Sequence, residues 1–85
     1  NYPNPFNAAT VIKYDLPNNR PVRILIFDLL GRTIKTINFE MMKPGKHEFI
    51  WYGNDSYLKP VSSGVYFIHI QAGEETRIQK ILLLK

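Results

Sequence analysis

Hydrophobic and polar residues alternate along much of the chain with a period of two, which is typical of β-strands rather than helices. The segment from Thr10 to Leu16 shows this simply, because Ile12, Tyr14 and Leu16 share one face. Further strand-like segments are predicted at residues 22–27, 33–39, 46–52, 65–72 and 77–84. The last segment ends in a continuous apolar run, Ile81-Leu82-Leu83-Leu84, which is typical of a strand covered on both faces.

Turn-forming residues separate these segments. Asp28-Leu29-Leu30-Gly31 predicts a tight hairpin, because aspartate accepts backbone N–H groups and glycine adopts positive φ. The longest connection runs over residues 53–64. Strands at this spacing with no helical period indicate an antiparallel sandwich or barrel. Asn1 to Asn7 is a candidate for a short additional edge strand or an extended lead-in.

Composition narrows the class of protein further. The chain has 85 residues, of which 45% are apolar and 21% charged, so we expect one folded domain over residues 1–85. The first residue, Asn1, is not Met and no signal-peptide pattern follows it, so we expect a fragment of a larger protein. Cysteine is absent, which excludes disulfides and thiolate metal sites. The net charge is +4, but the basic residues are scattered, so nucleic-acid binding is not expected.

Residues that could carry catalysis are sparse. His47 and His69 are the only imidazoles and lack metal-ligand spacing, and no serine lies in a Gly-x-Ser-x-Gly elbow. No carboxylate pair is suggested either. The sequence therefore predicts no enzyme activity, metal, cofactor or small-molecule substrate.

Two groups of residues allow both a structural and a binding interpretation. Trp51, Tyr52 and Tyr57 form either a sugar-stacking platform or a core tryptophan with loop aromatics, and the second is favoured. Asn54 and Asp55 offer oxygen ligands to calcium, but an Asx-type turn is favoured. Phe27, Phe49 and Phe67, together with Trp51, are expected to pack in the core or on a sheet face.

Motifs distributed over the whole chain carry a family resemblance. They are Asn1-Tyr2-Pro3-Asn4-Pro5-Phe6-Asn7; Thr10, Ile12, Tyr14, Leu16 and Pro17; Ile26-Phe27-Asp28-Leu29-Leu30-Gly31-Arg32; Gly45-Lys46-His47; Trp51-Tyr52-Gly53; Ser63-Gly64-Val65-Tyr66-Phe67; and Lys80 with Lys85. In this order the chain resembles the type A C-terminal sorting domains of the type IX secretion system, found on exported proteins of the Bacteroidetes. These are related in turn to the immunoglobulin-like domain of the flagellar hook-capping protein.

The resemblance implies an all-β, immunoglobulin-like antiparallel sandwich of about seven strands that serves as a non-catalytic sorting signal. Its partners would be an N-terminal cargo domain in the same chain and the outer-membrane secretion machinery. The protein would cross the periplasm and reach the cell surface or the medium. The family usually has a glycine near Leu58, and this departure bears on the long loop because leucine disfavours positive φ.

The resemblance also implies which residues the machinery recognises: Gly64, Tyr66, Lys80 and Lys85. Each has a structural alternative, since Gly64 and Tyr66 can serve folding alone and Lys80 can protect a sheet edge. Two other functions remain open at this point. One is a structural spacer or assembly module like the hook cap, and the other is a carbohydrate-binding accessory module.

Overall fold

Six β-strands build the part of the chain that the computed structural model describes, residues 9–84. They are β1 (Thr10–Leu16), β2 (Arg20–Asp28), β3 (Thr33–Met42), β4 (Gly45–Trp51), β5 (Gly64–Ala72) and β6 (Glu75–Leu83). The six predicted segments are thus confirmed, but the expected seventh strand is not found in this range. Its candidate, Asn1 to Asn7, lies outside the described residues. No helix capable of crossing a membrane occurs among the residues described.

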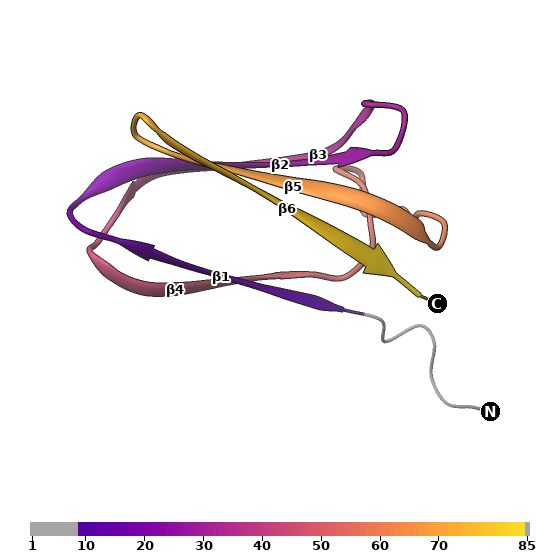
Figure 1. The fold of residues 1–85 in the computed structure, drawn as a ribbon, viewed down its shortest axis with the longest axis horizontal. Helices are drawn as coiled ribbons and strands as arrows, with labels where there is room; N and C mark the ends of the chain where they lie inside the picture. The colour runs from indigo at the N-terminus through magenta and orange to yellow at the C-terminus, as the bar shows by residue number, and fades with distance from the viewer. Residues whose placement is uncertain (1–8, 85) are drawn as a thin grey trace.

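The strands form two antiparallel sheets packed face to face (Figure 1). β1 pairs with β4 in one sheet, and the other sheet has the order β3-β2-β5-β6. The connections β1–β2, β3–β4 and β4–β5 each pass from one sheet to the other, which is the arrangement of a sandwich. The all-β, immunoglobulin-like fold class is therefore confirmed, with six strands in residues 9–84 where about seven were expected.

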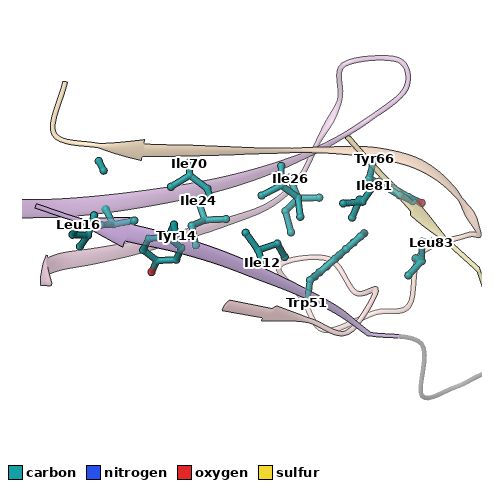
Figure 2. Packing of buried hydrophobic residues seen from close by; sticks show 13 residues of the cluster. Ile12, Tyr14, Leu16, Ile24, Ile26, Trp51, Tyr66, Ile70, Ile81 and Leu83 are labelled. Carbon is teal, nitrogen blue, oxygen red and sulfur yellow. The ribbon is translucent and has the colours of Figure 1, made fainter. Parts of the chain in front are cut away.

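The core lies between the sheets and is built by the period-two pattern (Figure 2). Each strand except β3 contributes alternate residues to it. The largest fully buried side chains are Trp51, Ile12, Ile24, Ile26, Ile68, Leu83 and Val22. Strand β3, at the edge, contributes only partly buried side chains such as Ile37 and Phe39. Face alternation thus assigns the inner positions correctly in all strands with a strong pattern.

Strand β6 contradicts one prediction. Ile81 and Leu83 are buried, but Leu82 and Leu84 are 61% and 68% exposed. The run is therefore not covered on both faces. β6 is the edge strand of its sheet, and the two-stranded sheet covers only the inner side of its last residues. The continuous apolar run therefore consists of alternate buried residues, Ile81 and Leu83, and solvent-exposed residues, Leu82 and Leu84.

The β2–β3 hairpin confirms the predicted turn chemistry. The Asp28 Oδ1 atom accepts hydrogen bonds from the backbone N–H groups of Leu30 (3.0 Å) and Arg32 (2.8 Å). Its Oδ2 atom accepts a third from Arg32 Nε at 2.7 Å. Gly31 has a φ of 83°, a conformation that is unfavourable for residues with a side chain. One aspartate and one glycine therefore close this turn.

Candidate functional site

Three of the four residues expected to be recognised, Gly64, Tyr66 and Lys80, lie on the β5–β6 hairpin, but not on one face of it. Gly64 begins β5 and lies opposite Leu83, whereas Tyr66 lies opposite Ile81. Lys80 lies opposite Phe67, so its side chain is on the other face of the sheet from that of Tyr66. Lys85 lies outside the described residues.

Tyr66 is a core residue with a fixed hydroxyl. Its side chain is 5% exposed, and its ring meets that of Trp51 edge to face, with centroids 5.0 Å apart. The hydroxyl donates a hydrogen bond to the Ser62 carbonyl at 2.6 Å, four residues upstream. This resembles the tyrosine corner of immunoglobulin-like sandwiches. Burial, followed by the nearby charge of Asp28, raises the pKa of Tyr66, so the hydroxyl stays protonated and can donate.

Gly64 has a geometric reason to be glycine. Its φ of 157° is a conformation that residues with side chains rarely adopt, although a Cβ there would meet no atom within 4 Å. Gly64 is therefore favoured by the backbone geometry at the start of β5. It connects Ser62, whose carbonyl accepts the Tyr66 hydrogen bond, to the strand that carries Tyr66. Together these features give Gly64 and Tyr66 clear structural roles.

The long loop between β4 and β5 is organised by Trp51 and Asp55. Trp51 is fully buried and its Nε1–H donates to the Asn54 carbonyl at 2.8 Å, so the core interpretation is confirmed and the tryptophan cannot stack on sugars. Asp55 Oδ1 accepts from the N–H groups of Tyr57 (2.8 Å) and Lys59 (2.9 Å), which confirms the Asx-type turn. The Asn54 Oδ1 atom accepts from Lys35 Nζ at 2.6 Å.

The outer face of the four-stranded sheet is apolar to an extent that alternation alone did not lead us to expect. We use this term for the outward positions of β2, β5 and β6, namely Arg23, Leu25, Phe27, Val65, Phe67, His69, Gln71, Thr76, Ile78, Lys80 and Leu82. The polar residues Gln71 and Thr76 lie at the end of the face near the β5–β6 turn. Ile78 and Leu82 are 67% and 61% exposed. The phenylalanines lie opposite each other on β2 and β5 and are half-buried, as expected for face packing.

The signal for this face was present in the sequence. Within the predicted strand 65–72, the period-two pattern puts Val65, Phe67 and His69 on one face, and the structure confirms this. The pairing of β5 with both β2 and β6 could not be read from the chain, and it is this pairing that brings Phe27, Ile78 and Leu82 beside them.

No cluster of side chains typical of metal binding is found between residues 9 and 84. This range contains no group of three or more His, Cys, Asp or Glu side chains that could hold a metal ion. A surface hollow of about 510 Å³ carries mixed charges and is lined by Lys13, Tyr14, Asp15, Lys46, His47, Glu48 and Arg77. Within it His47 stacks on Tyr14, and its Nε2 atom lies 2.7 Å from the Lys43 carbonyl, which indicates a structural imidazole.

Two solved structures share this fold at low sequence identity. FlgD from Pseudomonas aeruginosa is 20% identical with a TM-score of 0.70, and the match covers 93% of this chain and 62% of that one. FlgD from Xanthomonas campestris, described in connection with the hook capping essential for flagellar assembly, is 18% identical with a TM-score of 0.69 over 93% of this chain and 58% of that one. At such identity the likeness shows the fold alone, and the chain spans less than two thirds of either structure.

Sequence comparison gives the family. No curated protein matches the chain. The model of the secretion system C-terminal sorting domain matches residues 1–84, almost the whole sequence, in agreement with the motifs that run from Asn1 to Lys80. The chain therefore belongs to the secretion system C-terminal sorting domain family.

Proposed function

We propose that this domain is a non-catalytic sorting signal that directs a cargo, attached at its N-terminal side, across the outer membrane through the type IX secretion system. The family match over residues 1–84 is the observation that carries this proposal. The cargo would pass through the periplasm and reach the cell surface or the medium. Residues 1–85 would then be one domain of a larger exported protein.

The structure favours a signal that is carried by the folded domain over one carried by a linear motif. Two of the four residues assigned to recognition serve the fold in the described structure: Tyr66 is buried, and Gly64 sets the entry to β5. Lys80 is exposed and remains accessible to a partner. We therefore propose that Gly64 and Tyr66 contribute to sorting by shaping the β5–β6 hairpin, whereas Lys80 meets the machinery directly.

A structural or assembly module is the second candidate function. The fold similarity to the two FlgD structures, with TM-scores of 0.70 and 0.69, favours it. In that case the domain would act as an immunoglobulin-like spacer and would carry no export information of its own. The two functions differ in what happens to an unrelated protein that is joined to the domain.

The test is an export assay with a periplasmic reporter fused to the N-terminal end of residues 1–85. The fusion is produced in a host with an active type IX system and in an isogenic strain without it. We expect the reporter in the medium or on the cell surface in the first strain only. If the folded fusion remains in the periplasm of both strains, the domain is not an autonomous signal and the structural-module function is favoured.

Lys85 is tested in the same assay. Lys85→Ala should leave the folding free energy within about 0.5 kcal/mol, the usual range for substitutions away from a packed site. Its export should fall if the terminal lysine is part of the signal. Normal export of this variant would show that Lys85 is dispensable.

A further inference from the structure

We propose that the outer face of the four-stranded sheet is a docking surface for a protein partner whose own surface is apolar at its centre and carries carboxylates at its rim. The inference rests on the proposed function, since that partner would be a component of the secretion machinery. It assigns recognition to Phe67, Ile78, Lys80 and Leu82, of which only Lys80 was expected.

The apolar character of the face is the first support. Across the sheet, Leu25, His69 and Ile78 lie in one row and Phe27, Phe67 and Lys80 in the next. In the last row Val65 lies opposite Leu82. Apolar groups therefore continue over three adjacent strands, and those on β6 are more than half exposed. A continuous apolar patch of this kind is typical of an interaction site, whereas single exposed apolar residues are common on any protein.

The core, secondly, does not need these residues. The inner positions of β2, β5 and β6 already supply the buried side chains, among them Ile24, Ile68 and Leu83. Ile78 and Leu82 have no such packing, because they are on the opposite side of the edge strand. Polar residues at these two positions would satisfy the fold equally well, so their apolar character points to binding.

The charge of the face is the third support. Arg23 and Lys80 are the charged residues at the outward positions of β2, β5 and β6, and none of the seven acidic residues of the chain lies there. On the neighbouring strand β3, Glu40 lines a surface hollow together with Arg23, so the cation that a partner carboxylate would meet is Lys80. A second copy of the chain would bring cations against cations, and its net charge of +4 opposes self-association.

Charge also favours a protein over a membrane. Basic segments that bind anionic lipid surfaces usually gather four to eight Lys or Arg residues, and this face has two. The centre of the face carries Phe27 and Phe67 at opposite positions, with the Phe27 and His69 rings 6.4 Å apart. This suits a well-packed protein interface, in which aromatic residues are enriched.

The test uses the reporter fusion in the active host. Two variants alter the face: Ile78→Ser combined with Leu82→Ser, and Lys80→Glu. Two matched controls have similar chemistry elsewhere. Leu29→Ser with Leu30→Ser changes leucines that are 69% and 78% exposed in the β2–β3 turn, and Arg77→Glu reverses a charge on the inner side of β6. Circular dichroism and the melting temperature of each purified fusion establish that it is folded.

We expect each face variant to lower the exported fraction about tenfold, as expected when an interface loses a residue that contributes ~1.4 kcal/mol to binding. Both controls should be exported like the unaltered fusion. Lys80→Arg, which keeps the positive charge, should also be exported normally. A photoreactive residue placed at position 78 should cross-link to a protein in the active host, whereas one at position 29 should not. Lys80→Glu keeps the test decisive if the double serine variant does not fold.

Several results would overturn the proposal. Folded face variants that are exported normally, while the unaltered fusion is exported, would exclude the face and leave the sorting function standing. A concentration-dependent dimer of the purified fusion that Ile78→Ser abolishes would assign the face to a second copy. Flotation with phosphatidylglycerol vesicles, lost in Lys80→Glu, would assign it to a lipid surface. If the unaltered fusion is not exported, the proposed function fails and the docking surface fails with it.

Discussion

Leu58 is a leucine in the left-handed region of backbone conformation, with a φ of 66°. Among the described residues it is the one non-glycine with positive φ, and it lies near the position where the family usually has glycine. Leucine therefore adopts positive φ here, within the turn in which Asp55 accepts hydrogen bonds from the N–H groups of Tyr57 and Lys59. Because the side chain is 73% exposed, it recovers little of the cost of this conformation by packing.

Leu58→Gly should therefore stabilise the domain. Left-handed backbone costs a side-chain-bearing residue about 1–2 kcal/mol, and glycine loses part of that gain, about 0.5–1 kcal/mol, through its greater freedom when unfolded. We expect a net increase of about 0.5–1 kcal/mol in the free energy of unfolding, measured by urea denaturation. Tyr57→Gly is the matched control, since Tyr57 is also exposed but has no positive φ. Stabilisation of both variants alike, or of neither, would contradict the strain at Leu58.

Trp51 is the largest of the fully buried side chains in the core. It is fully buried, donates to the Asn54 carbonyl and packs edge to face with Tyr66. Trp51→Ala should lower the free energy of unfolding by about 3–5 kcal/mol, the range for removing a buried large aromatic. Tyr52→Ala, at a 61% exposed neighbour, should change it by less than about 0.5 kcal/mol. Similar melting temperatures for both variants would show that Trp51 is not central to the core.

Tyr66→Phe separates the hydroxyl from the ring. It keeps the packing on Trp51 but removes the hydrogen bond to the Ser62 carbonyl. We expect a loss of about 0.5–1.5 kcal/mol in the free energy of unfolding, with export retained while the domain stays folded. Export that fails although the variant is stably folded would instead assign the hydroxyl a direct part in recognition.

At the scale of elements, two turns depend on ionised aspartates. Burial raises the pKa of Asp28, but the hydrogen bonds and charge of Arg32 and the N–H of Leu30 outweigh it, and its pKa lies below the usual value. At Asp55 the hydrogen bond from the Lys59 N–H has the largest effect and lowers the pKa, whereas burial raises it. The hydrogen bond from the Tyr57 N–H and the charges of nearby lysines lower it further, so the pKa lies below the usual value. A carboxyl with a lowered folded-state pKa stabilises the fold above its unfolded-state pKa, about 3.9.

The free energy of unfolding should therefore fall as the pH drops below about 4, where protonation removes these hydrogen bonds. Asp28→Asn and Asp55→Asn should each lower stability at pH 7 and make the acid-induced loss less steep. Asp15→Asn, on the exposed face of β1, is the comparison variant. Urea denaturation between pH 2.5 and 7 measures this. An unchanged acid slope in both turn variants would contradict this role of the two carboxylates.

The strands show how far sequence alone can lead. Alternation located all six, and Asp28 and Gly31 identified a turn, because these signals depend on neighbouring residues only. The nature of β6 could not be read in this way. An apolar run looks the same whether its second face is covered by the protein or left open at an edge, and only the order β3-β2-β5-β6 decides between the two. The motifs led to the β5–β6 hairpin but not to Ile78 and Leu82, for the same reason.

At the scale of the whole molecule, the structure separates what holds the sandwich together from what it presents. Trp51 and Tyr66 face inward, whereas Lys80 and its apolar neighbours on β6 face outward. Under the proposed function, a sorting domain of this design would act as a folded surface. Residues assigned to recognition can then affect export in two ways, through the shape of the hairpin or through direct contact with a partner.

The most direct test of sorting by a folded surface is the fraction of reporter exported by the unaltered fusion and by Trp51→Ala in the same type IX host. The variant keeps Gly64, Tyr66, Lys80 and Lys85 but should lose the fold, which circular dichroism and protease digestion verify. We predict export of the unaltered fusion and retention of the unfolded variant. Equal export of both, with the variant shown to be unfolded, would mean that the machinery reads a linear sequence and would contradict sorting by a folded surface.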